Sequence, residues 1–433
     1  MSVFLRNISV KGIKNLSKKV ELIFAKKEIN SFSELEAYNV KAIYGANGSG
    51  KTAIVHAFQI LHDIILKSGY LYDPDNTKNL FELMNKDCSK IDIEIEFFYS
   101  ENNEKPIIYY YSIQLEYKNN QFEIAHEKYS KRTSEYAKEK VIVETLNGAF
   151  VQYELDDSIK NDFTNLLKKR SFAEILLETK YTEDSKYLME TDPLLSLVFS
   201  SVVILDEKDN HVPVFGFTLE RLKEIYNYRL ENQAIFKSAE ETGYRTKILT
   251  KRQLKRYKSE ITSKEKFIRL FKPSIKGIKV VSKLVKTSND ENIYLVNDFI
   301  DYGDYAIDIE FESIGLKKLM SLYNTFKHIS EGGIVVIDEL DSHINDVYLV
   351  KLVEYVSKFT KGQLIFTTHN VSPMEVLKSK KNSIDFMTLS GEIVSWTQVG
   401  NYSPSKLYQK GMVQGLPFNI DAESFLAVFD DEQ

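Results

Sequence analysis

The chain has 433 residues, 43% of them hydrophobic, and a formal net charge of −5 at pH 7. This length fits two or three domains, or one large domain with an insertion. Its one cysteine, Cys88, excludes an intramolecular disulfide framework and a cysteine-based metal site. The N-terminus has no apolar signal core, and the longest nearly uninterrupted apolar run, residues 194–205, is shorter than the ~20 residues of a membrane-spanning helix. We therefore expect a soluble cytoplasmic protein without a membrane partner, in which any nucleic-acid contact comes from a local patch.

The first 130 residues are rich in predicted strands, because apolar and polar residues alternate over much of this region. The strands are expected within residues 2–24, 40–43, 91–99, 107–117 and 121–128. Asn119 and Asn120 form the expected turn between the last two strands. Apolar residues at helical spacing after Thr52 predict a helix directly behind the strand at 40–43.

Residues 45–52 read Gly-Ala-Asn-Gly-Ser-Gly-Lys-Thr, a complete phosphate-binding loop between that strand and that helix. Its glycines permit a turn whose N–H groups point at phosphate oxygens, and the flanking elements argue against a chance glycine turn. Lys51 is placed to hold the β- and γ-phosphates of ATP, and the Thr52 hydroxyl to ligate Mg²⁺. The predicted ATP-binding residues of the loop are Gly45, Asn47, Gly48, Ser49, Gly50, Lys51 and Thr52.

The middle of the chain, residues 131–290, has a different character. Helical apolar spacing at residues 159–177 and 219–235 predicts a mainly helical insertion, and no heptad repeat is sustained. Residues 245–286 carry fifteen Lys and Arg residues and only two acidic ones, and an acidic stretch follows at residues 298–312.

This basic patch has three interpretations. The aromatic residues interleaved in it would permit base stacking, which favours nucleic acid. It could equally dock an acidic partner protein, or be a solvated helix face that pairs with the acidic stretch. The interleaved aromatic residues are Tyr244, Tyr257, Phe267 and Phe271.

The chain returns to α/β character at residues 306–370. Two apolar runs, 332–337 and 364–368, predict buried strands with a helix at 346–359 between them. This β-α-β unit makes the two strands expected parallel neighbours. We therefore predict an α/β fold whose core is formed by residues 1–130 and 291–433, with residues 131–290 inserted.

Two acidic residues end the first of these strands. Beside a phosphate loop, Asp338 would hold Mg²⁺ through water, and Glu339 would be the general base that orients the attacking water. A solvated acidic turn is the alternative, which the phosphate loop makes less favourable.

Two further positions are candidate ATP contacts. Ser313 and Gly315 begin an apparent helix and form a second anion site, suited to the γ-phosphate of a neighbouring chain's ATP. His369 follows the second strand, where it could hydrogen-bond the γ-phosphate and the attacking water. An ordinary serine helix cap and a structural histidine are the simpler alternatives.

The order of these motifs resembles that of the ABC-type ATPases, in their soluble SMC- and RecF-like branch. The resemblance rests on residues 45–52, Ser313 with Gly315, the run Val-Ile-Asp-Glu-Leu-Asp-Ser at 336–342, and Thr-Thr-His-Asn at 367–370. It is similar above all to ATPase subunits of bacterial phage-defence systems, of the abortive-infection, Septu and PARIS types. The resemblance implies a P-loop ATPase with ATP and Mg²⁺ as cofactors, Lys51, Glu339 and His369 as catalytic residues, and Thr52 and Asp338 at the metal.

The sequence departs from this family in three places. The signature at Ser313 and Gly315 lacks the Leu-Ser-Gly-Gly-Gln form, and Gln114 is only a weak candidate for the glutamine loop. The D-loop run Asp-Ser-His at 341–343 lacks the helix that usually follows it. Relatives of the overcoming-lysogenisation-defect type carry a nuclease domain after the switch histidine, where this chain has 64 residues. We expect no nuclease activity of its own.

The resemblance implies two protomers that sandwich two ATP molecules, closing on ATP binding and opening on hydrolysis. The expected role is a sensor or regulator of a separate effector, such as a nuclease, in anti-phage defence. The alternatives are a RecF- or SMC-like DNA repair or recombination ATPase, an ATP-gated scaffold, and the ATP subunit of a transporter, against which the large polar insertion argues.

Overall fold

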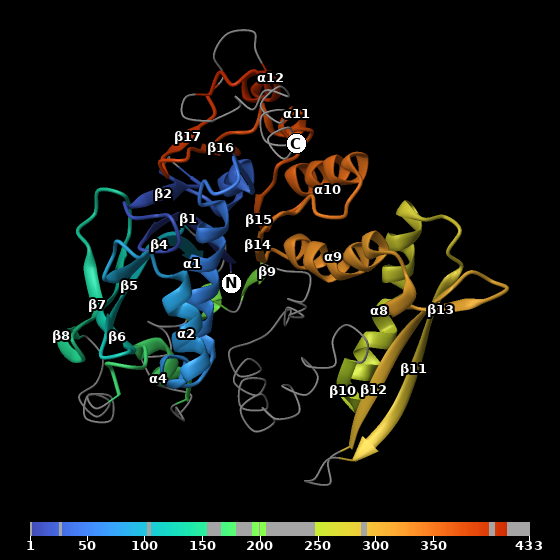
Figure 1. Cartoon of the computed structure of the whole chain (residues 1–433), viewed down its shortest axis with the longest axis horizontal. Coiled ribbons are helices and arrows are strands. Elements are labelled where there is room, and N and C mark those ends of the chain that lie inside the picture. The colour runs from blue at the N-terminus through green and yellow to red at the C-terminus, as the bar shows by residue number, and fades with distance from the viewer. Residues whose placement is uncertain are drawn as a thin grey trace, which may run out of the picture.

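A computed structural model describes residues 2–25, 28–101, 105–153, 166–178, 193–198, 200–204, 247–286, 292–397 and 403–413. Its central element is a six-stranded, mainly parallel sheet (Figure 1). In spatial order the strands are β17 (Ile393–Ser395), β16 (Ile384–Met387), β3 (Val40–Gly45), β15 (Gln363–Thr367), β14 (Ile334–Ile337) and β9 (Ser201–Ile204). Only β17 runs antiparallel to its neighbour. The four-residue strands β14 and β16 are buried at every position, as expected of strands covered on both faces.

Helices cover both faces of this core sheet. The helix α1 (Lys51–Leu66) packs its apolar residues between the core sheet and the N-terminal strands. The opposite face is covered by α9 (Ile314–Ser330), α10 (Asp346–Phe359), α11 (Met374–Leu377) and α12 (Pro404–Gln409). The predicted α/β fold class is confirmed, as are the phosphate-loop strand, the helix behind it and the β-α-β unit β14–α10–β15.

The N-terminal strands form a second, fully antiparallel sheet. Asn119 and Asn120 have φ values of 50° and 62°, which makes the tight turn between β5 and β6 that the sequence predicted. The spatial order is β2 (Val20–Ile23), β1 (Ser2–Lys11), β4 (Lys90–Ser100), β5 (Ile107–Lys118), β6 (Gln121–Arg132), β7 (Lys140–Leu146) and β8 (Ala149–Tyr153). Helices α2 (Pro74–Leu83) and α4 (Phe172–Glu178) and the 3₁₀ helices η1 (Phe32–Tyr38) and η2 (Tyr70–Tyr72) complete this half.

One side chain joins the two sheets. Gln363 in β15 is fully buried, and its Oε1 accepts a 2.9 Å hydrogen bond from the Leu5 backbone N–H. Its Nε2 donates to the Leu5 carbonyl oxygen at 3.3 Å. The register of β1 against β4 shifts between Leu5 and Asn7, so the amide of Gln363 satisfies backbone groups at this bulge.

The third sheet forms an arm. It contains β10 (Lys247–Thr250), β11 (Gly277–Lys286), β12 (Asn292–Asp301) and β13 (Ala306–Asp308), with η4 (Ile309–Phe311) after it. The helix α8 (Lys251–Phe271) lies along this sheet and buries Leu254, Ile261 and Ile268, which are seven residues apart. Figure 1 shows the arm projecting from the core beside α9.

The prediction of a mainly helical insertion at residues 131–290 needs correction for its described part. This part holds the strands β7 to β11 as well as α4 and α8, and β9 belongs to the core sheet through its parallel pairing with β14. Within the apolar run 194–205, residues 194–198 are helical and Ser201–Ile204 form the core strand β9. Residues 219–235 and 159–165 lie outside the described residues, while α4 begins at Phe172 within the other predicted helical segment. The proposed domain boundaries stay a prediction.

A buried carboxyl group should make stability depend on pH. Glu127 in β6 is fully buried, and it accepts hydrogen bonds from the Tyr111 hydroxyl at 2.6 Å and the Phe172 backbone N–H at 3.0 Å. Burial is the main cause that raises the pKa of Glu127 to about 8. Because the folded state then holds a proton that the unfolded state releases above about pH 4.5, stability is greatest below that pH and is lost as pH rises toward 8.

Urea unfolding at pH 5 and pH 8 tests this expectation. Relative to Glu127→Gln, the wild type should lose roughly 2–4 kcal/mol of unfolding free energy between the two pH values. Equal pH dependence in both proteins would show that Glu127 does not titrate in this range.

Candidate functional site

Three predicted site segments follow neighbouring strands of the core sheet. The strands β3, β15 and β14 are adjacent and parallel, so their carboxyl ends meet at one edge. The phosphate loop follows β3, His369 lies two residues beyond β15, and Asp338 comes directly after β14. This edge is the usual place for ligands in parallel sheets.

The phosphate loop has backbone shapes that need glycine. Gly48 and Gly50 have φ values of 77° and 107°, which side chains rarely adopt. A Cβ on Gly50 would also lie 2.7 Å from a methyl of Leu16. Nothing lies within 4 Å of a Cβ placed on Gly48, so the open side of the loop is at that residue.

Lys51 folds back over its own loop. Its Nζ donates hydrogen bonds to the carbonyl oxygens of Gly45 at 2.8 Å and Ala46 at 3.0 Å. Burial lowers the pKa of Lys51, and the nearby carboxylates of Asp338, Glu339 and Asp341 oppose this shift. The loop lysine and the acidic residues after β14 therefore share one electrostatic site.

A threonine hydroxyl fixes the two acidic residues. Thr367 Oγ1, at the end of β15, donates to Asp338 Oδ1 at 2.5 Å and accepts a 2.8 Å hydrogen bond from the Glu339 backbone N–H. Glu339 has φ of 48°, a conformation that costs a non-glycine residue about 1–3 kcal/mol. Its side chain is exposed, so the strained turn presents the carboxylate at the surface of the site.

Ser313 and Gly315 lie at the start of α9, at the end of this helix that packs against the arm. Ser313 is exposed and caps the helix, because its Oγ accepts a 3.3 Å hydrogen bond from the Leu316 N–H. A Cβ on Gly315 would approach the His343 carbonyl oxygen at 3.0 Å. The beginning of α9 packs on α8 through Leu316 and Met320, and its end packs on the core sheet.

Most of the remaining predicted residues lie at the nucleotide site, and Gln114 lies elsewhere. His369, Asn47 and Gly48 are exposed, Thr52 is half-buried, and Ser49 is buried. Gln114, the weak candidate for a glutamine loop, lies within β5, where it hydrogen-bonds Lys90 and Asp92, so that hypothesis is wrong.

Three site residues escaped sequence reasoning. Lys14 and Asn15 lie after β1, and the Asn15 side chain donates a 2.6 Å hydrogen bond to the Gly48 carbonyl oxygen. Burial lowers the pKa of Lys14, while the charge of Asp338 opposes the shift, so this lysine also faces the site. Only Thr367 had a sequence signal, its place beside His369.

The residues present fit ATP and Mg²⁺. The buried Ser49 Oγ has no hydrogen-bond partner among the described residues, and the glycine loop forms a cradle that Cβ atoms would fill. No group of three or more His, Cys, Asp and Glu side chains in the described chain could hold a metal alone. Thr52 and Asp338 would instead hold Mg²⁺ together with phosphate oxygens and water, its usual mode of binding.

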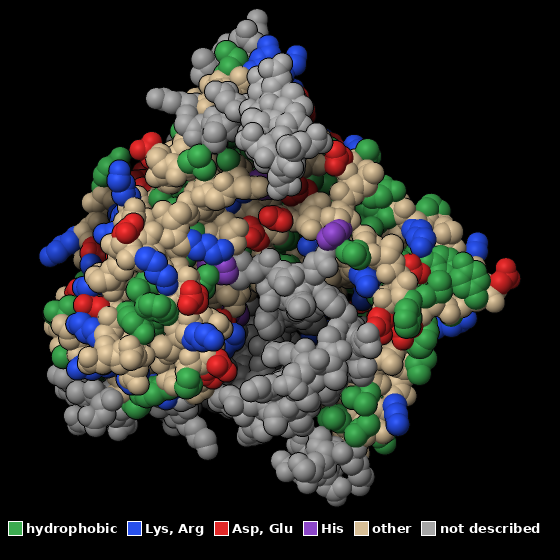
Figure 2. Space-filling view, viewed as in Figure 1, with side chains coloured by type: hydrophobic (Ala, Val, Ile, Leu, Met, Phe, Trp, Pro, Cys, Tyr) green, Lys and Arg blue, Asp and Glu red, His purple; other side chains and the backbone are tan. Residues whose placement is uncertain are grey.

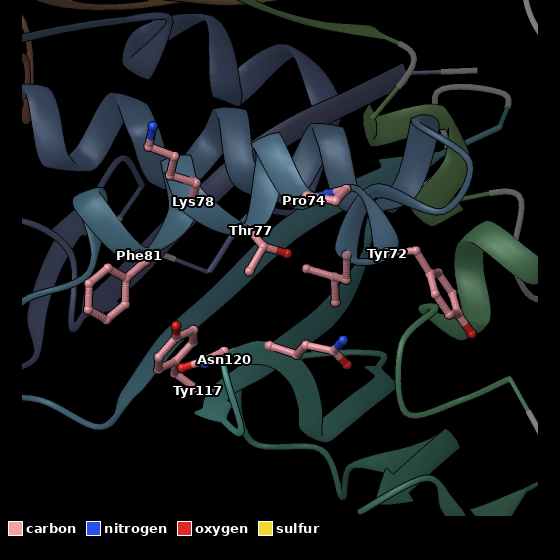
Figure 3. A pocket seen from close by; sticks show the side chains of 9 residues that line it. Tyr72, Pro74, Thr77, Lys78, Phe81, Tyr117 and Asn120 are labelled. Carbon is pink, nitrogen blue, oxygen red and sulfur yellow. The ribbon is translucent and has the colours of Figure 1, made fainter.

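A groove elsewhere on the chain is not this site. It has a volume of about 300 Å³ and lies between α2 and the turn that joins β5 to β6 (Figure 3). Its only charged lining residue is Lys78. The other lining residues are Leu71, Tyr72, Pro74, Thr77, Phe81, Tyr117, Asn120 and Gln121.

The basic patch at residues 245–286 is only partly free. Tyr257 packs against the arm core and donates a hydrogen bond to buried Asp298, and Phe271 packs on Tyr348 of α10 with ring centroids 4.9 Å apart. Lys272 pairs with Glu312 and Lys279 with Asp301. Tyr257 therefore packs inside the arm and Phe271 packs against the core, so neither stands open for bases; Tyr244 lies outside the described residues.

Residues 41–374 match the model of a family described as "AAA domain, putative AbiEii toxin, Type IV TA system". No curated protein matches the chain. Solved structures similar to it include an Smc head with an extended coiled coil bound to the C-terminal domain of ScpA, from Pyrococcus furiosus (16% identity, 95% of this chain and 99% of that chain, TM-score 0.41). Others are an SmcHead bound to the C-winged helix domain of ScpA (16%, 91% and 98%, 0.42) and the SMC head domain from Thermotoga maritima (16%, 91% and 99%, 0.35). Among the described residues, no helix is long and apolar enough to cross a membrane.

Proposed function

Because the chain belongs to this AbiEii-type family of AAA domains, and so to the P-loop ATPases, we propose that it binds and hydrolyses ATP between two copies of itself. In this proposal it regulates a separate effector, such as a nuclease, in anti-phage defence, and works in the cytoplasm without nuclease activity of its own. The family description refers to toxin–antitoxin systems, which supports a role in defence.

The observation that carries the ATPase proposal is the convergence of Lys51 with Asp338 and Glu339. The three come from strand ends of one sheet and interact electrostatically. Lys51 would exchange its two carbonyl partners for phosphate oxygens. Bound Mg²⁺ would neutralise phosphate charge between Thr52 and Asp338.

The proposed roles of the next residues follow from their exposure. Glu339 presents its carboxylate at the surface, where it would accept a proton from the attacking water. His369, exposed beyond the neighbouring strand β15, would hydrogen-bond the γ-phosphate. These assignments use the side chains at the same edge of the core sheet.

Dimerisation is supported by the position of Ser313. Its helix starts against the arm, so the exposed serine and Gly315 are free to meet the ATP of a second copy. Two such contacts, related by symmetry, would close a dimer around two ATP molecules. The γ-phosphate of ATP would contact the second copy only in the closed dimer, so it makes the closed and open states differ in free energy.

The contacts of the arm with α9 and α10 would couple its position to closure of the dimer. Lys327 of α9 pairs with Glu260 of α8 at 2.9 Å, and the Tyr348 hydroxyl of α10 donates a 3.1 Å hydrogen bond to the Phe271 carbonyl oxygen. A movement of α9 at Ser313 would therefore move α8 and its sheet as a unit. This coupling supports a partner on the arm.

A second candidate, a DNA repair or recombination ATPase, is favoured by one face of α8. Its exposed residues include Lys251, Arg252, Lys255, Lys258, Lys266 and Arg269. Such a row of cations would bind phosphates. In contrast, hydrophobic side chains gather at the β13 end of the arm, where Tyr305 and Phe311 are 58% and 78% exposed (Figure 2). That end favours a protein partner, which is why we place regulation first.

Binding measurements on Lys51→Ala test the proposal. Loss of a buried lysine that holds phosphate should weaken ATP affinity roughly 100-fold and abolish phosphate release. Lys67→Ala is the matched control, because this lysine caps the other end of α1 and its side chain is 51% exposed. Equal ATP affinity in the wild type and in Lys51→Ala would refute a phosphate-loop site.

A further inference from the structure

The C-terminal helix α12 inserts an aromatic residue beneath the nucleotide site. Tyr408 is only 6% exposed, although its helix is a short element outside the core sheet. Its ring stacks on Phe386 of β16 with centroids 5.6 Å apart and meets the edge of Tyr44 of β3 at 6.0 Å. Figure 1 shows α12 beside α11, next to β16 and β17. These rings tie the helix to the two strands that flank the start of the phosphate loop.

The hydroxyl of Tyr408 reaches that loop itself. It forms a hydrogen bond with the backbone of Gly45, the first residue of the motif. The Gly45 amide is the donor, because this bond favours the ionised hydroxyl and so opposes the effect of burial on its pKa. Gly45 is also the residue whose carbonyl oxygen accepts a hydrogen bond from Lys51.

The surroundings of Gly45 leave no room for adjustment. A Cβ at this position would lie 2.5 Å from the Met387 carbonyl oxygen and 2.7 Å from Ser49 Oγ. The end of β16, the loop serine and Tyr408 therefore hold one backbone segment together. A displacement of α12 would therefore change the backbone position of Gly45 in the phosphate loop.

Two serine hydroxyls order the start of α12. Ser405 Oγ donates a 2.7 Å hydrogen bond to Glu375 Oε1 of α11, and the Ser403 hydroxyl caps α12 by accepting a 3.3 Å bond from the Lys406 N–H. Leu407 and Val413 pack against the same core cluster as Tyr408, so apolar burial holds α12 in place.

We propose that Tyr408 is a positioning residue of the nucleotide site, and that its packing against β3 and β16 sets the affinity of the site for ATP. This inference rests on the proposed ATP binding and adds to it a positioning contact from the C-terminal segment. Tyr408 holds Gly45 in the conformation that receives phosphate. Without this hydrogen bond, the loop would bind ATP less tightly.

The test uses Tyr408→Phe, which removes the hydroxyl and keeps the ring. Its ATP Kd and KM should rise about fivefold, as expected for the loss of one positioning hydrogen bond, while kcat stays within about twofold. Tyr408→Ala, which also removes the stacking, should raise both constants further. A purely structural role would not separate KM from kcat in this way.

Tyr111→Phe is the control for general loss of stability. It removes a buried hydroxyl that donates to Glu127 in the other sheet, so it should lower the melting temperature and leave ATP Kd unchanged. An unchanged Kd in Tyr408→Phe, with tight ATP binding by the wild type, would overturn this inference alone. Failure of the wild type to bind ATP would instead overturn the proposed function, and this inference with it.

Discussion

Replacing Glu339 with glutamine is expected to slow ATP hydrolysis at least ~100-fold while ATP still binds. Glutamine keeps the size of the side chain and its place on the strained turn at φ 48°, but it no longer accepts a proton from water. The Lys51 and Thr52 contacts that we assign to phosphate and Mg²⁺ stay in place. The effect should therefore fall on kcat and leave affinity within about twofold.

Phosphate release and equilibrium ATP binding measure the two effects separately. Glu331→Gln is the matched control, since Glu331 is exposed at the far end of α9. This variant should hydrolyse ATP at the wild-type rate. If Glu339→Gln hydrolyses ATP as fast as this control, another group activates the water. If it loses ATP binding instead, Glu339 supports the structure of the site and is not its base.

Removing either partner of the Lys41–Asp385 ion pair should destabilise the core sheet by roughly 3–5 kcal/mol. The pair joins neighbouring strands β3 and β16 at 2.8 Å, and both side chains are only 1% exposed. A single change leaves one charge buried without its counter-charge, which costs far more than the pair gains. Lys41→Met should therefore be among the most destabilising substitutions in the chain.

The double variant Lys41→Met with Asp385→Leu separates charge from packing. Because it buries no charge, it should recover most of the lost stability. Urea unfolding can be followed by fluorescence of Trp396, the one tryptophan, whose backbone N–H donates to the Ile384 carbonyl oxygen beside the pair. A double variant as unstable as the single one would show that packing, and not the unpaired charge, causes the loss.

Local patterns in the sequence predicted the elements that build the nucleotide site. The phosphate loop, β14 and β15 each depend on a short run of residues whose burial and turn chemistry are local. Strand β9 could not be recognised, since its four residues, three of them apolar, join the sheet only through pairing with β14, more than a hundred residues later. The lysines of β11 mask its alternation, so the sequence pattern assigns this basic strand to a helical region.

The site shows the same division. The sequence predicts Lys51 from the phosphate-loop motif, and Asp338 and Glu339 from their place at the end of an apolar strand. Asn15 reaches Gly48 and Tyr408 reaches Gly45 only after the chain has folded, so no spacing in the sequence indicates them. The aromatic residues of α8 suggest stacking on bases, yet Tyr257 packs inside the arm and Phe271 packs on Tyr348 of α10.

Light scattering of the wild type and of Glu339→Gln, each with and without ATP and Mg²⁺, tests ATP-driven dimerisation most directly. We expect Glu339→Gln to form a lasting species of twice the 50.1 kDa chain mass with nucleotide, and the wild type to do so only transiently. Masses that are identical with and without nucleotide in both proteins would contradict this account. Ser313 and Gly315 would then be an ordinary helix start, and association would not depend on ATP.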